Sequence, residues 1–284
     1  MKLQAKAKIN LSLDVLGERE DGYHELRTVM AGVRNLYDTV FMEEASAVTV
    51  GCTEKLPEDN TAFRAASLFS SRFGCGGARI HIEKSIPSQA GLGGASADAA
   101  AVLRGMQQLY GYPASEDQLY ALAAEIGADV PFCLHGGVCL CEGIGERIKP
   151  LDVSLGIPIV LLKCEAGVST AALFRSLKPR PQHKLFHSLR VPIMRRETVL
   201  LLSSLRKRDI SGIAEGLHND LLAPAATLLP EIGENIERLL ALGAVGAGMS
   251  GSGSCVFGIF ASAGAAQSAY MSLSDTAFAF CGEI

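Results

Sequence analysis

The residue types most suggestive of chemistry lie in one stretch, residues 87–98, with the sequence PSQAGLGGASAD. Glycine and serine recur there, between an alternating apolar pattern upstream and a helical apolar pattern downstream. A glycine-rich turn that leads into a helix exposes backbone N–H groups at the positive end of the helix dipole, and such a turn binds anions, usually phosphate. The stretch therefore predicts a protein that handles a nucleotide or a phosphorylated metabolite. The alternative is an ordinary strand-to-helix turn.

The segments on either side predict how this turn is held. Ile80 and Ile82 alternate with polar residues, the period of a half-buried strand, and Pro87 ends the strand because proline has no N–H to donate to a sheet. Apolar residues at helical spacing over 99–109 predict a helix that stops near Gly111. The turn therefore stands between a strand and a helix, as a phosphate-binding turn requires.

Residues 8–15 form a second candidate region. Their alternation predicts a strand with Lys8, Asn10, Ser12 and Asp14 on one face and apolar residues on the other. Lys8 and Asn10 would lie roughly 6.5 Å apart along that face, where an ammonium and an amide could hold a transferring anionic group and orient its partner. The pattern by itself favours a solvated face of a sheet.

Two further segments carry side chains suited to catalysis or binding. Asp129 follows a helix that we expect to end at Gly127, and it precedes the apolar Phe132, so that partial burial is plausible. Its carboxylate is a candidate general base, and the alternative is an exposed aspartate in a turn. Tyr23 and His24 are adjacent in a polar loop. They could stack on a nucleobase and hydrogen-bond to its edge, or both could be surface residues.

A second glycine-rich segment, GAGMSG at 246–251, matches the dinucleotide-binding pattern G-x-G-x-x-G. That pattern requires a strand before it and a helix after it. Residues 232–242 have helical spacing and residues 255–260 are strand-like, so the order is inverted and a Rossmann site is not predicted. The overlapping loop at 248–254 could still approach the first turn and line a cleft, or be a helix-to-strand turn without a ligand. Walker A and protein-kinase motifs are absent from the sequence.

Composition narrows the possible partners. The 284 residues carry a formal net charge of −4, and the most basic cluster, residues 206–208, is short, so nucleic-acid binding is not expected. No apolar run reaches the roughly 18 residues of a membrane span, and the alternating N-terminus does not resemble a signal peptide. The eight cysteines are scattered, and we interpret them as small buried residues in a reducing cytoplasm. Cys139 and Cys141 share one face of a strand, but no second pair completes a metal site.

The order of elements indicates two domains. Strand patterns alternate with helix patterns along the chain, which predicts a mixed α/β or α+β architecture. The composition changes after Pro150, and residues 157–162 form a short apolar run typical of a buried strand. We therefore expect one domain over residues 1–152 and another over residues 153–284.

These segments together resemble one group of small-molecule kinases. In chain order they are similar to the motifs of the 4-diphosphocytidyl-2-C-methyl-D-erythritol kinase family, which belongs to the GHMP kinase superfamily. The glycine-rich turn and the final Gly-Ser loop mark the superfamily, whereas AKIN, DGYHEL and GADVPF narrow the resemblance to this family. The matching segments are AKIN (7–10), DGYHEL (21–26), DN (59–60), IPSQAGLGGASADAA (86–100), GADVPF (127–132), GIGERI (143–148) and SGSGSCVF (250–257).

The resemblance implies an enzyme that uses ATP, with Mg²⁺, to phosphorylate the 2-hydroxyl of a cytidine diphosphate-linked methylerythritol, a step of the non-mevalonate isoprenoid route. By this resemblance Asp129 would take the hydroxyl proton. Lys8 would lie near Asp129 and stabilise both its ionised form and the charge that builds on the phosphoryl group. Asn10 would position the substrate, and Asn60 would lie toward the adenosine. The residues that would wrap the ATP phosphates are Pro87, Ser88, Gln89, Ala90, Gly91, Leu92, Gly93, Gly94, Ala95, Ser96 and Ala97.

The resemblance also implies a cytosine-binding clamp. Tyr23 and Phe174 would lie on the two faces of the base, and His24 would read its edge. Where the family usually has G-G-G-S-S, this chain has G-G-A-S-A. Ala95 would bring a methyl group toward the phosphates, and Ala97 would lack a hydroxyl that could bond a phosphate or help to hold Mg²⁺.

The fold implied by the resemblance is that of a two-domain GHMP kinase. A ribosomal-protein-S5-domain-2-like N-terminal domain and a ferredoxin-like α/β C-terminal domain would enclose the active site in a cleft. Such a protein would be cytoplasmic, a monomer or weak homodimer, with a small molecule as its partner. Two alternatives stay open. One is another GHMP-type kinase, acting on homoserine, a mevalonate-like compound or a sugar alcohol, and the other is a catalytically silent nucleotide sensor.

Overall fold

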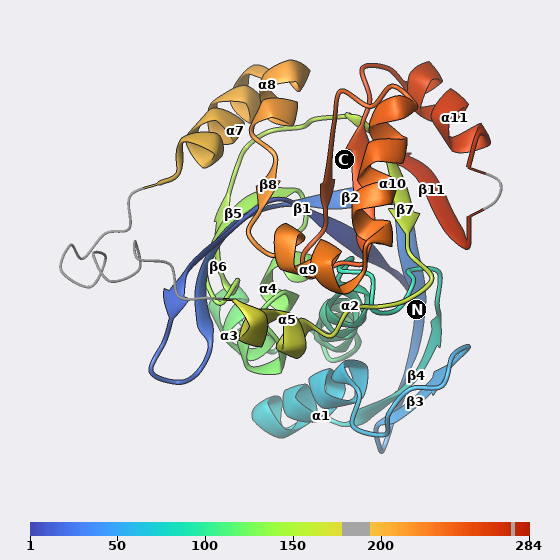
Figure 1. Ribbon diagram of the computed structural model, residues 1–284. Coiled ribbons are helices and arrows are strands. Elements are labelled where there is room, and N and C mark those ends of the chain that lie inside the picture. The colour runs from blue at the N-terminus through green and yellow to red at the C-terminus, as the bar shows by residue number, and fades with distance from the viewer. Residues whose placement is uncertain (178–193, 274–275) are drawn as a thin grey trace.

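The computed structural model describes residues 1–177, 194–273 and 276–284, and the fold below is that of these residues. Two sheets and the helices packed on them make up the molecule (Figure 1). The strands are β1 (Lys2–Glu18), β2 (His24–Ala45), β3 (Thr49–Cys52), β4 (Gly77–Glu83), β5 (Val138–Gly143), β6 (Arg147–Pro150), β7 (Pro158–Lys163), β8 (His218–Asn219), β9 (Gly246–Met249), β10 (Cys255–Ile259) and β11 (Phe278–Glu283). The helices are α1 (Thr61–Phe73), α2 (Gly94–Leu109), α3 (Glu116–Ile126), α4 (Val130–His135), α5 (Thr170–Ser176), α7 (Arg196–Lys207), α8 (Ile210–Glu215), α9 (Leu222–Leu228), α10 (Glu231–Ala241) and α11 (Ala263–Met271).

The first sheet is built mainly from the N-terminal half of the chain. Its strands pair in the order β3-β4-β2-β1-β8, and β2 also pairs with β5, which pairs with β6. Helices α1, α2 and α3 contact one another, and both α2 and α4 contact β1. Figure 1 shows α1 beside β3 and β4 at the bottom of the molecule, far from α11 at the top.

The second sheet has the strand order β11-β7-β10-β9, and its central strands β7 and β10 are buried on both faces. In β7, Ile159 and Leu161 lie in the first core, which also contains apolar residues of β1, β2 and α2. Val160 and Leu162 lie in the second core, between this sheet and helices α5, α9, α10 and α11. The apolar run over 157–162 is therefore a strand covered on both sides, as its continuous hydrophobicity predicts.

The elements predicted around the glycine-rich turn are present. The preceding strand is β4, with Ile80 and Ile82 buried, and the following helix is α2. The glycine segment at 246–251 begins with β9 itself, preceded by α10 and followed by β10, and this order confirms that it is not a Rossmann turn. Residues 206–208 lie at the exposed end of α7.

The cysteines are free thiols, and half of them are buried. Cys139 and Cys141 pack with Met30 and Phe132 in a small apolar cluster. Burial raises the pKa of Cys139 to about 11, so this thiol is protonated at neutral pH. Among the described residues, no helix has the length and apolar character to cross a bilayer.

The strict alternation expected for residues 8–15 is wrong because β1 contains a β-bulge. Between Asn10 and Ser12 the register with β2 shifts by one residue. The inserted residue leaves Lys8 and Asn10 on one face of the sheet and moves Ser12 and Asp14 to the other. The expectation of a solvated face is also wrong, since all four side chains belong to residues that are at most 4% exposed.

The two halves of the chain are joined through shared structure. Strand β8 pairs in parallel with β1, where Ser12 lies opposite His218. The first core combines Ile9 and Leu103 of the first half with Leu201 and Phe257 of the second. The boundary expected between residues 152 and 153 stays a prediction.

A buried ion pair crosses this junction. Asp14 Oδ1 lies 2.9 Å from His218 Nε2, and Asp14 Oδ2 accepts a hydrogen bond from Thr198 Oγ1 at 2.8 Å. The other ring nitrogen, Nδ1, lies 3.0 Å from the Gly216 carbonyl oxygen. Both nitrogens thus face acceptors, which fits the doubly protonated imidazolium. Burial acts to lower the pKa of His218, but the bonds to Asp14 and Gly216 outweigh it and raise the pKa.

The His218→Gln variant is expected to lower the free energy of unfolding by about 1–3 kcal/mol near pH 6, because buried Asp14 loses the imidazolium. Since the folded pKa of His218 is raised above 6.5, its contribution is full below that value and is lost as the pH rises through the folded pKa. Urea unfolding near pH 6 and near pH 9 should therefore give a smaller difference between variant and wild type at the higher pH. A difference independent of pH would contradict this account.

Candidate active site

Lys8, Asn10 and Asp129 meet on one face of β1. Lys8 Nζ lies 2.7 Å from Asn10 Oδ1 and 3.2 Å from Asp129 Oδ2. The lysine side chain is 4% exposed, whereas that of Asp129 is 31% exposed. Asp129 directly precedes α4 but does not cap it with its side chain. The carboxylate is therefore paired with an ammonium and still accessible, as a general base must be.

Asn10 is fixed by contacts from two other segments. Its side-chain nitrogen donates to Thr28 Oγ1 at 2.8 Å, and its backbone N–H donates to Ser250 Oγ at 3.2 Å. The amide oxygen is the atom that faces Lys8. Asn10 therefore holds the ammonium in place beside Asp129.

The glycine-rich turn lies directly against Lys8. The backbone N–H of Lys8 donates to the Leu92 carbonyl at 2.9 Å. A Cβ built on Gly93, whose φ is +73°, would lie 2.9 Å from Lys8 Cγ, so only glycine fits there. Gly93 precedes α2 and supplies no side-chain cap. The N–H groups of the first turn of α2 are therefore left for a ligand beside Lys8.

The residues of this turn divide into two groups. The side chains of Ala90, Leu92 and Ala97 are at most 2% exposed and pack in the first core, so these positions can offer a ligand only their backbone. Ala97 was expected to matter because it lacks a hydroxyl that could bond a phosphate or help to hold Mg²⁺. Its side chain faces the core, so a hydroxyl at this position would not face a ligand. Ala95 is exposed and is not among the residues with positive φ, so its methyl group does not strain the turn. Pro87, Ser88, Gln89, Gly91, Gly93, Gly94 and Ser96 are partly or fully exposed.

The loop at 248–254 approaches the glycine-rich turn, as one of the two interpretations of its sequence expects. Ser250 Oγ donates to the Gly91 carbonyl at 2.9 Å, and the Cys255 N–H donates to the Ala90 carbonyl at 3.1 Å. Asn219 holds the loop from the other side, because its side-chain nitrogen lies 2.9 Å from the Met249 carbonyl oxygen. The two loops therefore form one wall beside Lys8 and Asn10.

Two of the three residues expected to clamp a nucleobase lie in contact. The rings of His24 and Phe174 have centroids 5.0 Å apart and are tilted by 35°. Tyr23, the residue before His24 in the sequence, is 59% exposed and lies at the turn between β1 and β2. The structure thus brings His24 and Phe174 together from distant parts of the chain and leaves the Tyr23 ring open to solvent.

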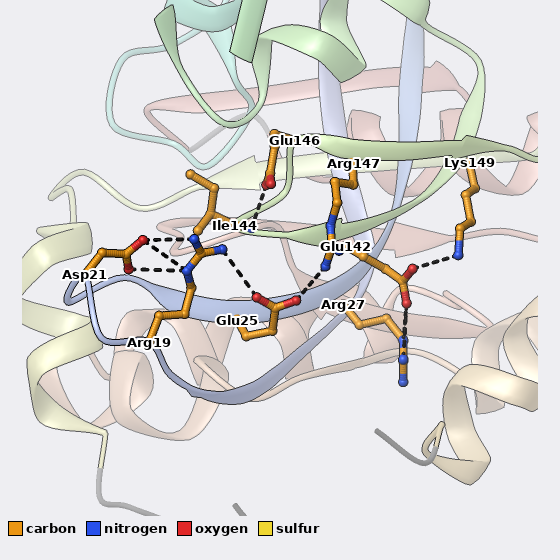
Figure 2. Close-up of polar contacts among 9 residues, drawn as sticks. All are labelled: Arg19, Asp21, Glu25, Arg27, Glu142, Ile144, Glu146, Arg147 and Lys149. Carbon is orange, nitrogen blue, oxygen red and sulfur yellow. Dashed lines mark hydrogen bonds and ion pairs between the residues drawn. The ribbon is translucent and has the colours of Figure 1, made fainter. Parts of the chain in front are cut away.

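The hairpin between β1 and β2 contains Tyr23, and ion pairs hold this hairpin against the neighbouring strands (Figure 2). Arg19 binds Asp21 at 2.9 Å and Glu25 at 3.5 Å, and Glu25 binds Arg147 at 2.6 Å. Asp21 Oδ1 also accepts the backbone N–H of Tyr23 at 3.1 Å. Exposed pairs such as these contribute little to stability, so we interpret the network as setting the position of the hairpin.

Asn60 lies beside the glycine-rich turn but has a structural role. It is the N-cap of α1, with Oδ1 accepting the Phe63 N–H at 2.9 Å and Nδ2 donating to the Pro57 carbonyl at 2.9 Å. The next residue, Thr61, donates to the Ala95 carbonyl at 2.7 Å. Asn60 thus anchors the helix that touches the turn, and its contact with adenosine stays a prediction.

Sequence reasoning missed several residues that position the site. Thr28 bonds to Asn10, and Asn219 supports the 248–254 loop, yet neither belongs to a pattern that would have distinguished it. Ser250 lies in the recognised Gly-Ser segment, but its two bonds, from the Asn10 N–H and to the Gly91 carbonyl, depend on long-range packing.

Comparisons with known proteins assign the chain to a family. The model described as "GHMP kinases N terminal domain" matches residues 60–137, and "GHMP kinases C terminal" matches residues 201–277. A curated 4-diphosphocytidyl-2-C-methyl-D-erythritol kinase of Caldicellulosiruptor bescii is 43% identical over 92% of this chain and 89% of its own length. The chain belongs to this kinase family. The kinase of the same name from Acetivibrio thermocellus is 41% identical over 97% of this chain and 95% of its own length.

Solved structures agree with the family. The crystal structure of a 4-(cytidine 5'-diphospho)-2C-methyl-D-erythritol kinase has a TM-score of 0.82 and 38% identity, covering 99% of this chain and 98% of that one. A homoserine kinase from Cytophaga hutchinsonii has a TM-score of 0.73 at 20% identity, over 100% of this chain and 95% of its own, and shows the fold alone. The two-domain GHMP kinase fold expected from the sequence is confirmed.

The close contact between the two loops can be tested at Gly91. A Cβ there would lie 2.0 Å from the Ser250 carbonyl oxygen, at a φ of +72°. Gly91→Ala should therefore lower the free energy of unfolding by about 1–3 kcal/mol beyond the cost of positive φ. Gly111→Ala is the matched control, because its φ is +73° and nothing lies within 4 Å of its Cβ. Equal destabilisation of the two variants in thermal unfolding would show that the contact is not tight.

Proposed function

We propose that this protein transfers the γ-phosphoryl group of ATP to the 2-hydroxyl of 4-diphosphocytidyl-2-C-methyl-D-erythritol, giving the 2-phosphate and ADP, in the non-mevalonate route to isoprenoid precursors. The observation that carries the proposal is the 3.2 Å contact between Lys8 and Asp129 against the glycine-rich turn. The names of the relatives supply the substrate. They do not favour homoserine, mevalonate-like or sugar-alcohol substrates, nor a silent sensor.

The proposed mechanism uses the site in a simple order. Backbone N–H groups of the turn and of the first turn of α2 bind the ATP phosphates. Asp129 accepts the proton of the 2-hydroxyl while the hydroxyl oxygen forms a bond to the γ-phosphorus of ATP. The bond between the γ-phosphorus and the β,γ-bridging oxygen breaks, which releases ADP. Lys8 stabilises negative charge on the transferring phosphoryl group. Asn10 holds the Lys8 ammonium through its amide oxygen and positions the substrate hydroxyl. Positioning and charge therefore carry most of the catalysis.

The proposed cofactor Mg²⁺ would neutralise charge on the β- and γ-phosphates. This ion takes oxygen ligands, usually one or two carboxylates together with phosphate oxygens and water. The partly exposed hydroxyl of Ser96, in the first turn of α2, would be the protein's oxygen ligand, because the Asp129 carboxylate is needed as the base.

The proposed base clamp places cytosine beside Phe174, with Tyr23 on its other face and His24 at its edge. His24 and Phe174 are already adjacent, which supports a preformed half of the clamp. We further propose that the protein acts in the cytoplasm as a monomer or weak homodimer, without nucleic-acid or membrane partners.

The direct test is to incubate the purified protein with ATP, Mg²⁺ and the cytidylyl substrate and to detect the 2-phosphate by phosphorus NMR or mass spectrometry. Homoserine and mevalonate serve as competing acceptors. Transfer to either of these at a comparable rate, or none to the cytidylyl substrate, would refute the proposal.

The catalytic roles can be separated from binding. Asp129→Asn and Lys8→Met should each lower kcat by about 10²–10⁴-fold while changing KM for ATP little, because they remove the base or charge stabilisation. The Asp129 side chain makes no cap hydrogen bond to α4, so the Asp129→Asn protein should fold, and circular dichroism and thermal unfolding check this. A loss confined to KM would contradict these roles.

The base clamp makes a different prediction. Phe174→Ala should weaken binding of the cytidylyl substrate by roughly 5- to 150-fold, the equivalent of about 1–3 kcal/mol of stacking, and leave KM for ATP unchanged. Tyr112→Ala is the control, because Tyr112 is an aromatic residue that is 66% exposed and far from His24 in the sequence. Inhibition by cytidine nucleotides should fall in parallel for Phe174→Ala. If both KM values rise together, the ring does not act on the base.

A further inference from the structure

A buried charge cluster that the mechanism does not use joins three segments of the first domain. Lys84, just after β4, lies between Asp38 of β2 and Asp98 of α2. Its ammonium is 2.7 Å from Asp98 Oδ2 and also binds Asp38 Oδ2. The side chains of Asp38, Lys84 and Asp98 are 0%, 6% and 4% exposed. The cluster is therefore cut off from bulk water.

The cluster touches both ends of the glycine-rich turn. At the entry, Asp38 Oδ1 accepts the backbone N–H groups of Ser85 at 2.6 Å and Ile86 at 2.8 Å, just before Pro87. At the exit, Asp98 belongs to α2, and a Cβ built on Gly94 would lie 3.5 Å from Lys84 Nζ. One ammonium thus connects the chain that enters the turn with the helix that leaves it.

This cluster is a costly way to stabilise a fold. Two buried carboxylates share one ammonium, and Asp98 Oδ1 has no hydrogen-bond partner among the described residues. Burial, assisted by the charge on Asp38, raises the pKa of Asp98 to about 7 even though Lys84 opposes the shift. Well-packed apolar side chains would stabilise such a place as well or better. We therefore look for the role of this charge cluster in the position of the segments that it joins, not in the stability of the fold.

We propose that Asp38, Lys84 and Asp98 are positioning residues that form a clamp and hold the two ends of the glycine-rich turn in place. The N–H groups of the turn are then already oriented to bind phosphate before a nucleotide arrives. The opposite side of the turn is held by Ser250 through the Gly91 carbonyl. The clamp rests on the proposed function in one respect, namely that the phosphates of ATP occupy this turn. Preorganisation of this kind lowers the cost of binding.

The test compares variants of Asp98 in steady-state kinetics and in direct ATP titration. Asp98→Ala frees α2 from the clamp but leaves Lys84 paired with Asp38. We expect KM and Kd for ATP to rise about tenfold or more, with kcat and KM for the acceptor much less affected. Asp98→Asn keeps an oxygen that can accept from Lys84, and should restore most of the affinity for ATP.

A matched control separates positioning from general destabilisation. Asp14→Ala also removes a buried, ion-paired carboxylate, but one on the face of β1 opposite to Lys8. It should lower stability without raising KM for ATP. If Asp98→Ala does not fold, Asp98→Ser, whose hydroxyl is too short to reach Lys84, is expected to show the same rise in KM for ATP.

The experiment tests the positioning role of the clamp and the proposed reaction separately. Equal effects of Asp98→Ala and Asp14→Ala on KM for ATP, or no rescue by Asp98→Asn, would overturn the clamp while wild-type activity leaves the proposed function standing. A wild type that binds ATP but does not phosphorylate the cytidylyl substrate would refute the proposed reaction, and the Kd values would still decide the clamp. A wild type that does not bind ATP would overturn both.

Discussion

The candidate site depends on three backbone segments that approach one another more closely than side chains would allow. The glycine-rich turn lies against Lys8 of β1 on one side and against the 248–254 loop on the other. At Gly91 and Gly93 a single added carbon would meet the Ser250 carbonyl or the Lys8 side chain. Because the contact at Gly91 and the hydrogen bond from Lys8 to Leu92 join main-chain atoms, the N–H groups of the turn are placed with a precision that flexible side chains could not supply.

Burial of polar groups follows from the same close approach. Lys8 and Asn10 are nearly inaccessible, yet each has its partners: Lys8 contacts Asn10 and Asp129, and Asn10 also bonds to Thr28 and Ser250. A polar network satisfied in this way is rigid, since any displacement would leave a buried group unpaired. The accessible carboxylate of Asp129 is thus the open end of an otherwise closed chain of hydrogen bonds.

Much of this could be read from local sequence, and the limits are physical. The strand before the turn, helix α2 and the buried strands β7 and β10 follow from periodicity, because each buries a continuous or regularly spaced apolar surface. The meeting of Lys8 with Asp129 came from resemblance to a family, since pattern alone favoured a solvated face for the one and an exposed turn for the other. Resemblance also placed His24 and Phe174 around one nucleobase, together with Tyr23, and the rings of His24 and Phe174 are in contact.

Other features depend on contacts that no local pattern encodes. The bulge in β1 moves Asp14 away from the Lys8 face, and it is visible only in the register with β2. The resemblance placed Asn60 toward the adenosine, and its capping of α1 is visible only in the geometry of that helix. Asp38, Lys84 and Asp98 lie in three separate segments of the sequence, and none belongs to a recognisable motif of charged residues. Their shared burial could therefore not be anticipated.

The pairing of β8 with β1 has a consequence for biosynthesis. The partners Asp14 and His218 are 204 residues apart, so the edge of the first sheet cannot be completed until most of the polypeptide has left the ribosome. Contacts at such separation slow folding, because a long loop must close before any of them forms. A nascent chain that ends before β8 would expose the uncovered edge of β1, which is the kind of surface that chaperones protect from misassociation.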